Sequence, residues 1–119
     1  MAVNPPRTDF KVTNIYHHPA AGVAATKTIT GGTGKVMVVD QIIWSFDRAL
    51  AAASSVLIES PAATTLFKID LSIAAVGSSP APCSLEFPKG FNGALGQDVV
   101  VTLGGTAGAE VGKLNVLYH

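Results

Sequence analysis

The clearest pattern in the chain is the alternation of apolar and polar residues over residues 65–73. In a pleated strand, side chains that stand two residues apart share a face. One face of this segment carries Phe67, Ile69, Leu71 and Ile73. The other face carries Leu66, Lys68, Asp70 and Ser72, of which three are polar. A strand with one wet face is typical of an antiparallel sheet, because parallel sheets are covered on both faces.

The longest apolar run, residues 35–47, predicts a central strand with both faces largely buried. Its apolar members are Val36, Met37, Val38, Val39, Ile42, Ile43, Trp44 and Phe46. The length of the run would suit a helix, but its β-branched and aromatic residues and its glycine-rich entry favour a strand. We expect Trp44 to anchor the core.

Weaker signals predict the other strands and their connections. Further strands are expected at residues 10–17, 23–30, 56–59, 84–87, 99–103 and 112–118. Pro61 and Pro88 are expected to end the strands before them, and residues 48–54 to form an irregular or one-turn connection. Loops are expected at residues 31–34, 77–82, 89–96 and 104–108, with Phe91 or Leu95 turned inward as a plug.

About eight short strands, separated by loop signals roughly every ten residues, predict the fold class. We expect an all-β fold that forms an antiparallel β-sandwich or jelly roll. An open immunoglobulin-like sandwich is the alternative, although the Cys/Trp/Cys spacing of true immunoglobulin domains is absent. A chain of 119 residues is expected to form one such domain, over residues 10–119.

Residues 1–9 are expected to form an extended N-terminal arm. Pro5 and Pro6 favour an extended backbone, and no apolar period precedes Phe10. We expect such an arm to become ordered against a partner. The sequence shows no basic leader followed by an apolar run, and no stretch of the roughly 18 apolar residues that a membrane span requires. Neither a signal peptide nor a membrane partner is therefore expected.

The composition indicates a surface that is poor in charge. Hydrophobic residues make up 48% of the chain and charged residues 13%, about half the usual charged share. Much of the apolar fraction is alanine, so it does not indicate an oversized core. Such a surface suits a subunit that packs against neighbours. Eight basic and eight acidic residues balance, so nucleic acid is not an expected partner.

The titratable residues form no predicted catalytic or metal site. His17 and His18 are adjacent and should point to opposite faces of a strand, and His119 would approach His17 only if the first and last strands pair. Cys83 is the single cysteine, so it cannot form an internal disulfide. We expect it to be a small, partly buried apolar residue. Asp40 stands in an apolar strand and should have a hydrogen-bond or ionic partner, because an unpaired buried carboxylate is costly.

The glycine-rich string at residues 31–35 superficially resembles a phosphate-binding loop. That motif requires a glycine where Ile29 stands and a serine or threonine where Val36 stands, so a hairpin loop is expected instead. The serines also lack the nucleophile motif of hydrolases. We therefore expect a protein that is not an enzyme and that uses no cofactor and no metal.

The order of segments resembles the small β-sandwich decoration, or cement, proteins of tailed bacteriophage capsids. The segments that carry this resemblance are TKTITGGTGKVMVVDQIIWSFDRALAAASSVLIES, TLFKIDLSIA, FPKGFNGALGQDVVVTL and KLNVLYH. In such proteins a threonine-rich strand leads through glycines into a hydrophobic strand, and a glycine-containing loop precedes a Val/Thr strand. The resemblance covers about residues 23–119, and the long proline-containing arm departs from it.

The resemblance implies a non-enzymatic virion subunit that is made in the host cytoplasm and binds the capsid exterior. As a dimer or trimer it would lie over junctions between major capsid proteins. The candidate interface residues are Pro5, Pro6, Arg7, Phe91 and Asn92. The alternative is a phage tail or fibre module that binds a partner protein or a cell-surface glycan, for which Phe91 and Asn92 are the aromatic and amide candidates.

Overall fold

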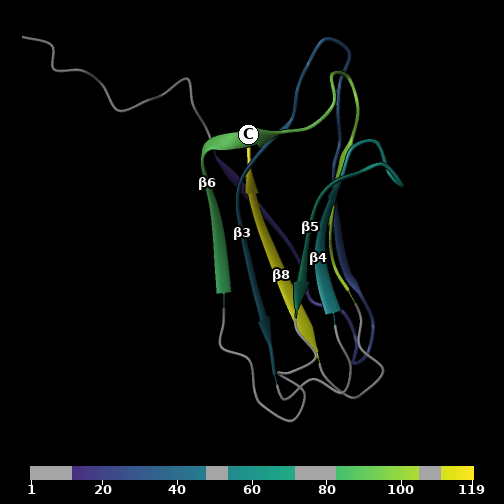
Figure 1. Ribbon diagram of the computed structural model, residues 1–119, viewed down its shortest axis with the longest axis vertical. Helices are drawn as coiled ribbons and strands as arrows, with labels where there is room; N and C mark the ends of the chain where they lie inside the picture. The colour runs from purple at the N-terminus through teal and green to yellow at the C-terminus, as the bar shows by residue number, and fades with distance from the viewer. Residues whose placement is uncertain (1–11, 48–53, 72–82, 105–110) are drawn as a thin grey trace, which may run out of the picture.

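The computed structural model describes residues 12–47, 54–71, 83–104 and 111–119, and these residues form eight strands and no helix. In chain order the strands are β1 (Thr13–His17), β2 (Ala25–Ile29), β3 (Val38–Phe46), β4 (Ser54–Glu59), β5 (Thr65–Leu71), β6 (Cys83–Asn92), β7 (Val99–Leu103) and β8 (Gly112–Tyr118). Sheet A has the order β1-β8-β3-β6, and sheet B has the order β2-β7-β4-β5. The two sheets face each other (Figure 1).

The strand pairing is nested, and every pair is antiparallel. β1 pairs with β8, β2 with β7, β3 with β6 and β4 with β5, and these pairs fall alternately in sheet A and sheet B. A long paired ribbon that folds over itself in this way has the connectivity of a jelly roll. The predicted all-β antiparallel sandwich is therefore confirmed, and the nested pairing separates it from the immunoglobulin-like alternative.

The core lies between the sheets and is mainly aliphatic. Its buried members are Ala25, Ile29, Val39, Ile42, Trp44, Val56, Ile58, Val99, Val101, Leu103, Leu114 and Val116. They recur at alternate positions because each strand turns every second side chain inward. Burying one such large side chain stabilises the fold by about 1.5–3 kcal/mol. Trp44 is 7% exposed, which confirms it as a core residue.

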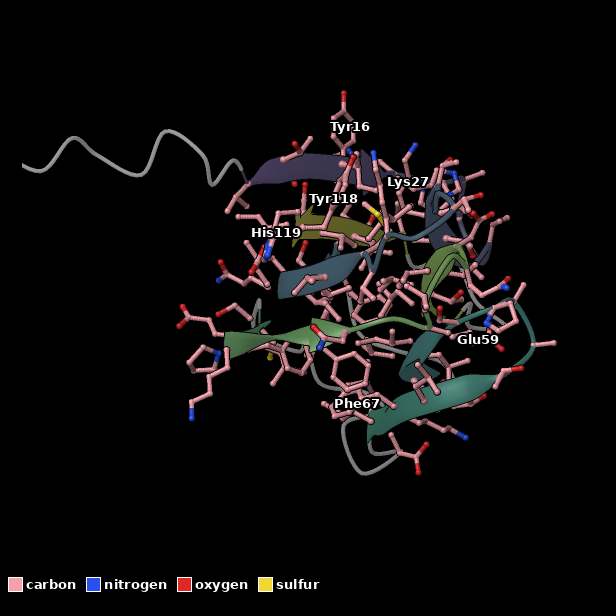
Figure 2. The ribbon with its side chains drawn as sticks, turned by 90° about the horizontal axis from the view of Figure 1, so that it is seen from above. Tyr16, Lys27, Glu59, Phe67, Tyr118 and His119 are labelled. Carbon is pink, nitrogen blue, oxygen red and sulfur yellow. The ribbon has the colours of Figure 1, made fainter. Side chains whose placement is uncertain are left out.

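Three phenylalanines close the side of the sandwich where β5 and β6 lie. The ring of Phe67 is 5.6 Å from the rings of both Phe87 and Phe91, and the last two are 5.2 Å apart. Figure 2 shows Phe67 between the strands of the two sheets. Since the β5 and β6 backbones belong to different sheets, these ring contacts hold the two edge strands together.

The structure corrects the prediction for β6. We expected a strand that Pro88 ends and a loop over residues 89–96, but β6 continues to Asn92. Proline is tolerated because β6 is an edge strand whose pairing with β3 is irregular at this point. Leu95 is 66% exposed and is not an inward plug, whereas Phe91 packs against the core.

Other differences concern connections and strand ends. The segment at residues 31–35 joins β2 in sheet B to β3 in sheet A, so it is a crossover between sheets and not a hairpin loop. Cys83 is exposed, whereas we expected it to be partly buried. The predicted arm, most of the connection at 48–54 and the predicted loop at 77–82 lie outside the described residues.

Candidate functional site

Two irregularities face each other on sheet A and set the geometry of the candidate site. β3 pairs with β8 through Val39 opposite Tyr118 and Gln41 opposite Leu117, so Asp40 is an extra residue, a β-bulge. On its other side, β3 pairs through Val39 opposite Phe91 and Gln41 opposite Glu86. Residues 87–90 of β6 therefore leave the ladder opposite Asp40.

Gly90 permits this excursion of β6. Its φ is +76°, a conformation that favours glycine, and a Cβ atom at this position would overlap Val38 Cγ1. The excursion and the bulge together leave a hollow of about 380 Å³ on sheet A. The hollow is lined by Val12, Asp40, Gln41, Glu86, Phe87, Pro88 and Leu117.

The hollow combines an apolar wall with two carboxylates. Val12, Pro88 and Leu117 are apolar residues of its lining, and Asp40 and Glu86 are its acids. Phe87 also borders the hollow, but its ring packs in the phenylalanine cluster between the sheets. Leu117, Gln41 and Glu86 form a continuous row across β8, β3 and β6, because each is the register partner of the next. Such a surface can hold an extended segment that offers both apolar groups and a cation.

Asp40 has the partner that its position in an apolar strand led us to expect. Its Oδ2 lies 2.7 Å from Nδ1 of His119, and the two side chains are 21% and 31% exposed. The backbone of His119 also exchanges two hydrogen bonds with Val38, each 2.9 Å long. The Asp40–His119 pair therefore ties the chain after β8 to the start of β3.

The first and last strands pair, but this pairing does not bring His119 to His17. Because β1 and β8 are antiparallel, His17 stands opposite Leu114, and His119 follows Tyr118 at the far end of the pair. His17 has another role, since its Nδ1 accepts a hydrogen bond of 3.0 Å from the backbone N–H of Thr26. The bond uses a backbone N–H of β2, which is an edge strand. That N–H is then not available to pair with a strand of another chain.

The outer face of sheet B is weakly charged and mostly regular, with one register shift between Ile58 and Glu59 where β4 pairs with the start of β5. Its central strands, β7 and β4, contribute Val100, Thr102, Ser55, Leu57 and Glu59, and its edge strands contribute Thr26, Thr28, Lys68 and Asp70. One row runs straight across the sheet as Thr26, Thr102, Leu57 and Lys68. Lys68 Nζ lies 3.5 Å from Asp70 Oδ1 on the edge strand β5, on the polar face that the alternation predicted.

The predicted interface residues do not come together within the described structure. Pro5, Pro6 and Arg7 lie outside the described residues. Phe91 turns inward to the phenylalanine cluster, whereas Asn92 is exposed opposite Val38. Neighbouring residues of a strand point to opposite faces, so these two do not form one exposed aromatic and amide site.

Sequence reasoning did not single out three residues that line the hollow, namely Gln41, Glu86 and Leu117. The proline and glycine within residues 84–92 were the available signal, because together they indicate a strand whose ladder is broken. Among the described residues, no group of three or more His, Cys, Asp or Glu side chains is placed to hold a metal ion.

No protein-family model matches the chain, and no curated protein matches its sequence. Within the described residues there is also no helix with the length and apolar content needed to cross a membrane. The basis for a function is therefore the fold together with its two outer faces.

Proposed function

We propose that this protein is a non-enzymatic structural subunit of a bacteriophage particle. In this role it decorates the capsid exterior and stabilises it by binding at junctions between major capsid proteins. The observation that supports this proposal best is the outer face of sheet B, which is regular apart from one register shift at the end of β4 and carries few charges. Because a fold alone does not give a function, the proposal depends on this surface and not on the jelly roll itself.

The chemistry of the face favours docking against another protein. At its centre are Val100, Thr102 and Leu57, whose burial requires no charge to be moved out of water. Lys68 and Asp70 lie on the edge strand β5, and Glu59 is the last residue of β4, so these charges lie at the side and at one end of the face, where they remain hydrated and guide orientation. An apolar centre within a polar rim is the common arrangement of protein interfaces.

The size of the face favours binding at junctions. Four strands spaced about 4.8 Å apart and five residues long cover a flat area of roughly 300 Å². A stable one-to-one complex normally buries about 800 Å² on each partner, so this face alone would bind weakly. Contacts with several capsid proteins at once would sum through multivalency to a stable association. A self-association into dimers or trimers would add to the same effect.

The test uses purified protein and expanded capsids that lack it. We expect binding at many regularly spaced sites and a higher resistance of the capsids to heat or chaotrope, because the subunit binds only the assembled form. Thr102→Lys at the centre of sheet B should abolish binding. Asn115→Lys, at a comparable position on a central strand of sheet A, is the matched control and should bind normally. Cryo-electron microscopy of the source particle that placed the protein only at the tail tip would contradict the proposal.

The alternative function, a tail or fibre module that binds a glycan, has one favourable observation. Tyr16 is 58% exposed, projects from β1 (Figure 2), and its ring centroid lies 4.8 Å from that of His18. An exposed aromatic next to polar groups suits a sugar ring better than Phe91 does. If Tyr16→Ala abolished binding to host cells while capsid binding was absent in the unchanged protein, this alternative would replace the capsid role.

A further inference from the structure

The edge strand β2 of sheet B carries two features that oppose pairing with another chain. Lys27 takes an inward-facing position, between the buried residues Ala25 and Ile29. Such a charge opposes edge-to-edge pairing, because a further strand beside β2 would bury it. In addition, the backbone N–H of Thr26 is bonded to His17 of β1. These two features protect one edge of sheet B.

The opposite edge of sheet B, β5, has neither feature. Among the described residues β5 pairs with β4 alone, and from Phe67 to Leu71 that pairing is regular. The segment contains no proline and no glycine. Its inward side chains are apolar but only half-buried, namely Phe67, Ile69 and Leu71. On the neighbouring strand β4, Val56 and Ile58 are fully buried. A further strand beside β5 would therefore remove more apolar surface from water.

We propose that β5 pairs with β5 of a second copy of the chain, in antiparallel orientation about a two-fold axis at Ile69. Each Lys68 then stands opposite Asp70 of the other copy, and each Phe67 stands opposite Leu71. Sheet B becomes one continuous sheet through both copies. The inference goes beyond the proposed function, since the pairing needs no capsid and assigns the surface through which the chain associates with itself.

The two-fold symmetry limits the possible registers of this pairing. When the axis stands perpendicular to the sheet, residues that face each other turn their side chains to the same side of the sheet. Backbone groups that point away from β4 then face groups of the other copy that also point away from β4. About four to six hydrogen bonds can therefore form between the two strands over residues 67–71.

The charges on the outer face select one of these registers. With the axis at Ile69, the Lys68 and Asp70 side chains of the two copies alternate in sign around the axis. Each acid then has a lysine on its own strand, 3.5 Å away, and another on the opposite strand. An axis at Lys68 or at Asp70 would place two like charges opposite each other, which is unfavourable. An axis at Phe67 or Leu71 would leave both charges without a partner on the other copy.

The segment is thus complementary to itself, as an interface with two-fold symmetry requires. Its outward charges of opposite sign are placed symmetrically about Ile69, and its inward side chains are all apolar. This symmetry favours a second copy of the chain as the occupant of the edge over an unrelated strand. The dimer would also widen the outer face of sheet B to roughly twice its area, since the strands continue at the same spacing.

The experiment is disulfide trapping between two differently tagged populations of the purified full chain. Both carry Cys83→Ser, so that the native thiol does not interfere. One also carries Lys68→Cys and the other Asp70→Cys, and the mixed pair keeps one intact lysine–aspartate pair. In the proposed register the two new cysteines are directly opposite, whereas two copies of the same variant place theirs on a diagonal, about 7–8 Å apart. A disulfide needs Cα atoms about 4.4–6.8 Å apart. We expect several-fold more mixed disulfide than disulfide between copies of the same variant.

The matched control places the same pair of cysteines on β2. Thr26→Cys and Thr28→Cys are also two residues apart and exposed on the outer face of an edge strand of sheet B. They should give several-fold less mixed disulfide than the β5 pair, because Lys27 opposes pairing at that edge. Equal trapping at the two edges would show that the disulfides arise from random collisions, and would overturn the proposal.

Charge exchange tests the register in chains that keep the native cysteine. Sedimentation equilibrium of the unchanged protein should show a dimer whose fraction rises with concentration. Lys68→Asp places acids opposite acids and should weaken dimerisation several-fold. The double variant with Lys68→Asp and Asp70→Lys regains opposite charges in the same register and should restore the dimer. A loss that the double variant does not restore would overturn the register.

Two other results would assign the edge to a different occupant and overturn the pairing of two copies. A protein that stays monomeric while every amide of β5 resists hydrogen exchange would show that the same chain covers the edge. A protein that stays monomeric alone, and whose Lys68→Cys variant is cross-linked only to a capsid protein, would make the capsid the occupant. Because trapping and sedimentation use no capsid, a failure of the capsid role leaves their outcome unchanged.

Discussion

The two outer faces of this sandwich differ in regularity, although both belong to antiparallel four-stranded sheets. On sheet B the row from Thr26 through Thr102 and Leu57 to Lys68 is continuous, and a register shift occurs only at the end of β4, between Ile58 and Glu59. On sheet A the corresponding ladder is interrupted on both sides of Asp40. The outer face of sheet B is weakly charged, whereas the outer face of sheet A has a hollow with two acids beside its interruption.

The difference shows how a broken ladder creates a polar site on a sheet. A regular strand can place an acid only where its alternation allows, and it then points either into the core or away from the sheet. The bulge at Asp40 instead turns the carboxylate along the surface, within 2.7 Å of the His119 imidazole. The irregular pairing of sheet A thus gives a hollow with two acids, which the row of paired residues across sheet B does not have.

Among the substitutions considered, Trp44→Ala is expected to have the largest effect, because the core between the sheets supports both outer faces. We expect Trp44→Ala to lower the free energy of unfolding by about 3–5 kcal/mol, since the ring is 7% exposed and its loss leaves a cavity. Urea titration measures the loss. Tyr16→Ala, which removes an aromatic ring that is 58% exposed on β1, should cost less than about 1 kcal/mol. A loss of that small size for Trp44→Ala would show that its ring is not enclosed.

Gly90→Ala is expected to damage only the face with the hollow. A β-carbon at residue 90 meets Val38 and also requires a left-handed backbone, so we expect a loss of about 2–4 kcal/mol. Gly34→Ala is the matched control, because Gly34 has a φ of +75° but nothing within 4 Å of the added Cβ. It should cost only the backbone penalty of about 1–2 kcal/mol. Equal losses in thermal unfolding would show that the contact with Val38 relaxes freely.

The regular parts of the fold could be predicted from sequence. β7 and β8 have the bounds that the alternation predicted, and β5 has the wet face that Lys68 and Asp70 indicated. In these strands each local preference agrees with the tertiary contacts. The prediction failed at β6 because the rule that proline ends a strand holds for central strands, and only the sheet order shows that β6 is an edge.

The hollow could not be predicted, because it depends on pairing between distant segments. Asp40 was expected to need a partner, but His119 becomes that partner only when β8 lies beside β3. The exposure of Glu86 beside Asp40 depends in turn on the register of β6 against β3. A single sequence records alternation along a strand but not register between strands.

The Asp40–His119 pair on sheet A is expected to contribute a smaller free energy, which can be compared with that of an ion pair on sheet B. The pair is short and partly buried, so a double-mutant cycle with Asp40→Ala and His119→Ala should give a coupling of about 1 kcal/mol. Chemical denaturation of the unchanged protein, both single variants and the double variant supplies the four values. Additive losses would show that the contact does not stabilise the fold. In that case the bulge at Asp40 would be held by backbone pairing alone.

The smallest effect is expected for the Lys68–Asp70 ion pair on the outer face of sheet B. Lys68 and Asp70 lie 3.5 Å apart, and their side chains are 53% and 81% exposed. Water and salt screen such a pair, so the same cycle with Lys68→Ala and Asp70→Ala should give a coupling below about 0.5 kcal/mol. This cycle is also the control for the Asp40–His119 cycle, because both remove one acid and one base from the outer surface of a sheet. A coupling as large as that of Asp40 and His119 would mean that the interrupted ladder adds nothing to the strength of its polar contact. The distinction between the two faces would then be one of shape alone.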